Sequence, residues 1–136
     1  MNFAVTIGTS KERTITVNLS QTTSFLWEGE NVISTPSMIA EMEETCRLLL
    51  KDQAIPDQEW DSVGTVVNVK HLAATPVGAE VFVKAKVVSV EGRRVMFEVE
   101  ARDKLEKIGE GNHERVIINI SRFRMKFNEK QKQLGL

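Results

Sequence analysis

Residues 34–53 read STPSMIAEMEETCRLLLKDQ, and this stretch decides the fold. A hydroxyl residue followed by proline is a strong helix start, so we expect Thr35 to cap the helix and Pro36 to be its first residue. Apolar side chains then recur at helical spacing and define one stripe: Met38, Ile39, Met42, Cys46, Leu49 and Leu50. The stretch therefore predicts one long amphipathic helix that must cover an apolar surface.

Most of the remaining chain is rich in extended segments. We predict strands at residues 3–7, 13–19, 62–71, 79–90, 94–103 and 108–125. A single helix is then the only element able to cover the buried face of an antiparallel sheet. This combination predicts an α+β hotdog fold, in which a curled antiparallel sheet of about five to six strands wraps one long central helix. We assign residues 1–128 to this single domain and expect residues 129–136 to form a frayed C-terminal tail.

Composition limits the possible functions. The chain has 136 residues and a net charge of -1, so no overall field attracts nucleic acid or an anionic membrane. A single cysteine excludes an intrachain disulfide and any multi-cysteine metal site. The first residues lack the pattern of a signal peptide, and no run approaches the ~18 apolar residues of a membrane span. We therefore expect a cytoplasmic protein with no metal, no cofactor, and no nucleic-acid or membrane partner.

Three polar residues are candidates for chemistry, and each also has a structural explanation. Thr35 can serve only as a helix cap. Glu43 borders the apolar stripe, but it can also form an ordinary surface pair with Arg47. His71 ends a predicted strand, where a hydrogen-bonded structural histidine is the simpler explanation. Taken together, a hydroxyl, a carboxylate and an imidazole supply the groups that a hydrolytic site needs.

Four segments resemble, in order and approximate spacing, the signature segments of the fluoroacetyl-CoA thioesterase family of hotdog proteins. They are TPSMIAEME, SVGTVVNVKHLAATPVG, SVEGRR and IGEGNHERVIIN. The resemblance covers about residues 34–128, and its most distinctive stretches are H-x-A-A-T-P-x-G and G-x-G-x-H-E-R.

The resemblance implies an enzyme that hydrolyses a small acyl-CoA thioester to the free acid and CoA. By the matching motifs, it implies that Thr35, Glu43 and His71 are catalytic. It also implies that Gly64 lies near the scissile group and that Arg115 belongs to the substrate-binding residues. A glycine inside a strand often marks the close approach of a ligand or of another backbone, which agrees with this role for Gly64.

The segment before the helix departs from the family. SFLWEGENVIS, residues 24–34, lacks the longer phenylalanine-bearing lid, so selectivity for a fluorinated acyl group is not expected. We predict instead that Phe25 and Trp27, with Leu26, form a different wall of the acyl pocket. Further on, the alternating cations of residues 121–127 predict either a basic solvent face on an edge strand or a contact with a CoA phosphate.

Two other functions remain open. A non-catalytic acyl-CoA binding or sensing module would use the same residues, although a carboxylate beside a neutral thioester would bring it little benefit. A hotdog hydratase fits less well, because the helix region has no Asp-x-x-x-x-His pair. We also expect a homodimer with acyl pockets at the subunit interface, because pairing two sheets edge to edge covers one exposed edge of each.

Overall fold

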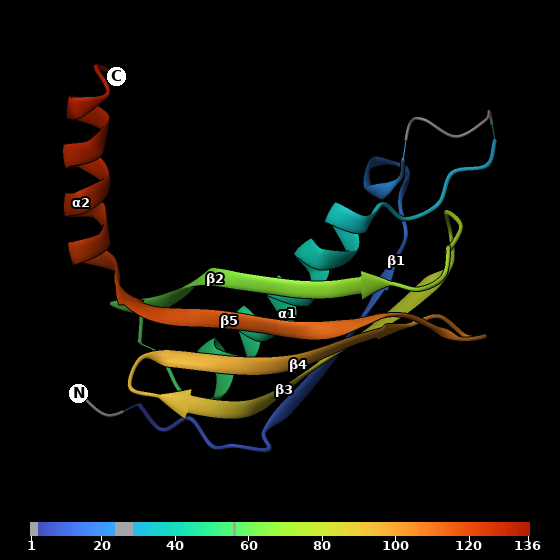
Figure 1. The fold of residues 1–136 in the computed structure, drawn as a ribbon, viewed down its shortest axis with the longest axis horizontal. Helices are drawn as coiled ribbons and strands as arrows, with labels where there is room; N and C mark the ends of the chain where they lie inside the picture. Colours follow the sequence, from blue (N-terminus) through green and yellow to red (C-terminus); the bar gives the residue numbers. More distant parts are fainter. Residues whose placement is uncertain (1–2, 24–28, 56) are drawn as a thin grey trace.

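The computed structural model describes residues 3–23, 29–55 and 57–136. Its elements are β1 (Ser10–Thr16), a short 3-10 helix η1 (Leu19–Gln21), α1 (Thr35–Gln53), β2 (Trp60–His71), β3 (Glu80–Glu91), β4 (Arg94–Arg102), β5 (Lys107–Asn119) and α2 (Ile120–Gln133). The strands form one antiparallel sheet in the order β1-β3-β4-β5-β2, and α1 packs across one face of it (Figure 1). The predicted hotdog arrangement of one long helix against a curled sheet is confirmed.

The core is the layer between α1 and the sheet. The buried residues of α1 are Met38, Met42, Thr45, Cys46, Leu49 and Leu50, which confirms the predicted stripe except that Ile39 is only half-buried. They face alternate residues of the central strands, among them Val83 and Phe97, which are buried almost completely. A fully buried side chain of this size contributes roughly 1.5–3 kcal/mol. Burial in this layer raises the pKa of the Cys46 thiol to about 12.

The start of α1 corrects one prediction. Ser34 is the N-cap, because its hydroxyl accepts a hydrogen bond from the Ser37 backbone N–H at 3.2 Å. Thr35 is already the first helical residue. The prediction that Thr35 caps the helix was wrong, since Ser34 provides the same chemistry one residue earlier. The Thr35 hydroxyl is therefore free for another partner.

The sheet ends in two edge strands, β1 and β2. On β2, Val66 and Val67 are 45% and 42% exposed, which is unusual for two adjacent valines in a strand. A register shift between Gly64 and Val66 marks a bulge in the pairing of β2 with β5. An apolar edge of this kind favours pairing with a further strand.

The two ends of the chain differ from the prediction. Residues 3–7 form no strand; Phe3 instead packs edge-to-face on Trp60 with ring centroids 5.1 Å apart, and β1 begins only at Ser10. The strand predicted at 108–125 ends at Asn119, where the side chain accepts a hydrogen bond from the Arg122 backbone N–H and caps α2.

The helix α2 replaces the last six residues of the predicted final strand and much of the predicted tail, whereas the earlier part of that strand forms β5. Phe123 and Phe127 are four residues apart, a spacing that fits one side of a helix, although the local alternation of cations and apolar residues also fits a strand. α2 has no buried residue and runs out from the sheet on the side of β2 (Figure 1).

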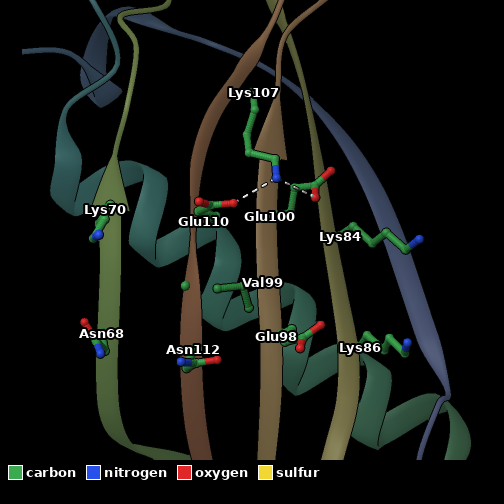
Figure 2. Close-up of a pocket in the computed structure, with 11 residues that line it drawn as sticks. Asn68, Lys70, Lys84, Lys86, Glu98, Val99, Glu100, Lys107, Glu110 and Asn112 are labelled. Carbon is green, nitrogen blue, oxygen red and sulfur yellow. Dashed lines mark hydrogen bonds and ion pairs between the residues drawn. The ribbon is translucent and has the colours of Figure 1, made fainter.

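The sheet face opposite α1 is charged (Figure 2). A hollow of about 560 Å³ on this face is lined mainly by lysine, glutamate and asparagine side chains. Lys107 lies between Glu110, at 2.8 Å, and Glu100, at 3.4 Å. The hydrogen bond to Glu110 raises the pKa of Lys107 and lowers that of Glu110. Such exposed pairs add little stability, and this hollow is lined by none of the predicted site residues that the structure describes.

Candidate active site

The first half of the predicted site lies where the start of α1 meets the end of β2. The Thr35 hydroxyl oxygen and His71 Nδ1 are 2.8 Å apart. Both side chains line a hollow of about 340 Å³, and the other lining residues are Val32, Leu72, Ala73 and Ala74. His71 Nε2 is buried and has no hydrogen-bond partner in the part of the chain that the structure describes. Thr35 therefore holds the imidazole through one nitrogen and leaves the other for a ligand.

The second half lies further along α1, where the half-buried Glu43 approaches β2. A Cβ added to Gly64 would lie 3.0 Å from Glu43 Oε1 and 2.9 Å from His113 Cε1, so only glycine leaves room here. The alternative that Glu43 pairs with Arg47 was wrong. Arg47 binds the Asp61 carboxylate through Nε and Nη2 and also contacts Glu44, which leaves Glu43 directed to β2.

Arg115 is buried next to Gly64, with only 6% of its surface exposed. Its Nε donates to Ser62 Oγ at 2.7 Å, and its Nη2 donates to the Ser62 carbonyl oxygen at 2.7 Å. Burial lowers the pKa of Arg115, and the charge of Glu43 is one of those that oppose the shift. The structure thus places a fixed positive charge close to the carboxylate of Glu43.

His113 also lies next to Gly64 and Arg115, although the sequence favours a structural histidine here and assigns it no catalytic role. It is 1% exposed, and its Nδ1 lies 2.8 Å from the Val66 carbonyl oxygen, to which it must donate. Its Nε2 therefore accepts the hydrogen bond from Arg115 Nη1 at 3.1 Å. Strict alternation along the final strand puts His113 and Arg115 on one face, and this was the signal that could have identified it.

The two halves do not meet within one chain. Thr35 and Glu43 are separated by about 12 Å along the helix axis. Gly64 and His71 are separated by about 23 Å along the strand. The structure brings Thr35 to His71, and Glu43 to Gly64 and Arg115, but it does not bring the three proposed catalytic side chains together.

The predicted acyl-pocket residues Phe25 and Trp27 lie outside the described residues. Within residues 3–23, 29–55 and 57–136, no helix is long and apolar enough to cross a membrane. The same ranges contain no group of three or more His, Cys, Asp or Glu side chains placed to hold a metal ion.

Comparison with known proteins identifies the family. Residues 17–121 match the family described as FlK: Fluoroacetyl-CoA-specific thioesterase. The chain belongs to this family. The fluoroacetyl-CoA thioesterase of Streptantibioticus cattleyicolor is 39% identical over 103 residues, which are 76% of this chain and 73% of the relative. The family resemblance and the predicted enzyme class, a thioesterase, are confirmed.

Solved structures agree with the family assignment. A structure of the fluoroacetyl-CoA thioesterase FlK is 31% identical and has a TM-score of 0.84, covering 93% of this thioesterase and 98% of FlK. A Thermus thermophilus protein described as a thioesterase superfamily member is 27% identical, with a TM-score of 0.83 over 96% of both chains. A hot-dog-like protein from Thermanaerovibrio acidaminovorans is 25% identical, with a TM-score of 0.81 over 91% of both chains.

In this thioesterase, the adjacent hydroxyls of Ser34 and Thr35 have different partners, because Ser34 caps α1 and Thr35 contacts His71. Ser34→Ala removes the cap and is expected to lower the free energy of unfolding by about 1 kcal/mol, with little change in turnover. Thr35→Val removes the hydroxyl that holds His71 but keeps the cap, so we expect a change in stability below about 0.5 kcal/mol and a clear loss of turnover. Urea unfolding and a hydrolysis assay on both variants test this. Equal losses of stability would contradict it.

The space at Gly64 gives a second prediction for this thioesterase. In Gly64→Ala the added methyl group would meet Glu43 Oε1 and His113 Cε1, and the flexible carboxylate is the group that can move. We expect kcat to fall roughly tenfold or more, because a small misplacement of a reacting group is costly. Thr65→Ala, one residue along and exposed, is the matched control and should keep kcat within about twofold. Equal kcat in the two variants would exclude the crowding argument.

His113 makes the stability of the thioesterase depend on pH. Burial and the nearby Arg115 charge lower the pKa of His113 below its usual 6.5. The unfolded chain therefore binds the proton more readily, so stability is complete above about pH 6.5 and is lost as the pH falls below it. Urea unfolding from about pH 7.5 to 5 should show a decline that is shallower in His113→Gln. Parallel curves for the two proteins would rule this out.

Proposed function

We propose that this thioesterase hydrolyses a small acyl-CoA thioester to the free acid and CoA, using Thr35, Glu43 and His71. The observation that carries the proposal is the imidazole of His71, which Thr35 holds at Nδ1 while the buried Nε2 has no partner among the described residues. The relatives support the substrate class. One is named for its action on fluoroacetyl-CoA, and one FlK structure contains fluoroacetate and CoA.

The reaction adds water to the acyl carbon and breaks the carbon–sulfur bond. Glu43 accepts a proton from the attacking water as a general base, or attacks the acyl carbon itself and forms a transient anhydride that water then hydrolyses. His71 donates a proton from Nε2 to the leaving CoA thiolate. Thr35 keeps the ring oriented for this transfer. The scheme uses no metal and no cofactor.

The other motif residues support these steps. Gly64 leaves space for the thioester beside the Glu43 carboxylate. Arg115 supplies a buried positive charge that favours any negative charge that develops on the acyl group. We assign Phe25 and Trp27 to the acyl-pocket wall. Because this segment lacks the family's longer lid, we expect acetyl, propionyl and fluoroacetyl esters to be hydrolysed with similar kcat/KM.

A homodimer would unite the two halves of the site. The unpaired edge strand β2 exposes Val66 and Val67, so two copies can pair these edges in an antiparallel manner. A two-fold axis midway between Gly64 and His71 would set His71 of one subunit beside Gly64 of the other. Each site would then take its imidazole from one chain and Glu43 from its partner.

Two measurements test the proposal. Purified protein should release free thiol from acetyl-, propionyl- or fluoroacetyl-CoA, and light scattering at micromolar concentration should give the mass of a dimer. Stabilisation by these esters without turnover would reject hydrolysis as the function of this site. A monomer that retains full turnover would instead reject the shared site while leaving the reaction in place.

A further inference from the structure

The helix α2 carries an apolar stripe that has no partner among residues 3–23, 29–55 and 57–136. Phe123, Phe127 and the C-cap residue Leu134 are 45%, 55% and 62% exposed. Their spacing of four and seven residues puts them within about 40° of one another around the helix, on the side that also contains Ile120. Met125, which is 71% exposed, points to the opposite side.

An isolated helix of this size is marginal in water. Stretches shorter than about 12–15 residues seldom stay helical without packing. α2 has 14 residues, and it is tied to the sheet mainly at its start, where the Asn119 side chain caps it and the Ile120 N–H donates to the Glu59 carbonyl at 2.9 Å. A regular helix with a continuous apolar stripe at this position indicates a surface that covers it.

The position of α2 indicates where that surface lies. Asn119 pairs with Trp60 at the first residue of β2, and α2 then leaves the sheet past the β2 edge (Figure 1). Its 14 residues span about 21 Å. This length corresponds to about four strands at a spacing of 4.7–4.9 Å. In the dimer of the proposed function, the space beyond β2 belongs to the partner subunit.

Antiparallel pairing of the two β2 edges brings the strand ends near His71 of the partner subunit next to α2. The Trp60 end of one subunit lies on the same side as the His71 end of the other. Three apolar side chains in the turns at the His71 end are exposed: Leu72 by 50%, Val77 by 43% and Leu105 by 89%. These are the exposed apolar groups that a helix crossing the strand ends would meet.

We propose that α2 of each subunit packs along the strand ends of the partner subunit, with Phe123, Phe127 and Leu134 covering the partner's Leu72 and Leu105. This inference rests on the dimer of the proposed function. Leu72 also lines the hollow that contains Thr35 and His71, so the partner's helix becomes part of the rim of that site. The substrate would then reach Thr35 and His71 through an opening formed by both subunits, and not through an opening formed by one subunit alone.

The test uses two charge substitutions on opposite sides of the same helix in the full-length protein. Phe123→Glu combined with Phe127→Glu should raise the dimer dissociation constant roughly tenfold or more, because it places two charges in an apolar contact. Met125→Glu, on the opposite side, should leave the constant within about twofold. Sedimentation velocity over a concentration series measures both. Equal constants for the two proteins would overturn the proposal.

A substitution on the other surface and an exchange experiment complete the test. Leu105→Glu should weaken the dimer as the double variant does, whereas Ile7→Glu, exposed in the N-terminal segment, should not. Amide exchange of residues 121–133 should slow when the wild type dimerises, and exchange that is equally fast in monomer and dimer would overturn the contact.

Two further outcomes separate this inference from its alternatives. A monomeric wild type would reject the dimer and the α2 contact together, whereas a stable dimer that tolerates Phe123→Glu with Phe127→Glu rejects only the α2 contact. α2 also carries several cations, and a basic amphipathic helix can bind an anionic membrane surface. If the wild type sediments with phosphatidylserine vesicles, and the double variant does not although it remains a dimer, then the α2 stripe binds a membrane and not the partner subunit.

Discussion

Glu43→Gln is expected to slow acyl-CoA hydrolysis by roughly 10³-fold, because the amide can neither accept a proton from water nor attack the thioester. His71→Ala should lose about 10²–10⁴-fold, since the leaving thiolate then has no positioned proton donor. Free-thiol release under saturating substrate measures both losses. Glu44→Gln is the matched control, because Glu44 neighbours Glu43 but pairs with Arg47 at 2.9 Å. Full activity in both Glu43→Gln and His71→Ala would remove the catalytic assignment.

Mixing two inactive variants tests whether the site is shared. When Glu43→Gln and His71→Ala subunits are unfolded together and refolded, about half of the dimers are hybrids. In a shared site, one of the two active sites of each hybrid contains both native residues, so about a quarter of the wild-type activity should return. A site contained in one chain would give no recovery, because each subunit would keep its own defect. The hybrid experiment thus distinguishes the two arrangements without a ligand-bound structure.

Arg115 is expected to matter for both folding and turnover. Arg115→Met leaves Ser62 and His113 Nε2 without their buried hydrogen-bond donor, and we expect stability to fall by roughly 2–4 kcal/mol. The loss of the fixed charge near Glu43 should lower kcat by about 10²-fold or more. Arg115→Lys keeps a charge but cannot bridge three acceptors, so it should recover stability only in part.

The controls for Arg115 separate a local effect from general destabilisation. Arg102→Met removes an exposed guanidinium that lies 3.7 Å from Glu100, and it should change stability by less than about 0.5 kcal/mol. Urea unfolding and turnover are measured on all three variants. If Arg115→Met unfolds no more easily than Arg102→Met, the buried hydrogen bonds described for Arg115 do not contribute to stability.

The sequence pattern was most informative where one period dominated. The apolar stripe of residues 38–50 identified α1, and alternation identified the strands that pair around it. The pattern failed at residues 120–127, where cations alternate with apolar residues while Phe123 and Phe127 also keep helical spacing. Both periods fit such a short stretch, and only the Asn119 cap separates strand from helix, so local sequence alone could not decide.

The site shows a similar division between motif and geometry. The matching motifs pointed to Thr35, Glu43 and His71, yet they did not show that one chain keeps Glu43 apart from the other two. The helix cap was predicted one residue too late because adjacent Ser34 and Thr35 have equivalent hydroxyls. Only the backbone conformation shows that Ser34 is extended and caps the helix, whereas Thr35 is already helical. The hydrogen bond between Thr35 and His71 joins residues that are distant in the sequence, so a local sequence pattern could not predict it.

The depth of Cys46 has a practical consequence for anyone who studies turnover in this protein. With its pKa raised to about 12 and its sulfur fully enclosed, the side chain stays a protonated thiol at any pH used for an assay. A colorimetric disulfide reagent such as dithionitrobenzoate should therefore leave the native enzyme unmodified. Every equivalent of colour would then report a molecule of released CoA, and the same reagent would start to react with the protein only when it unfolds.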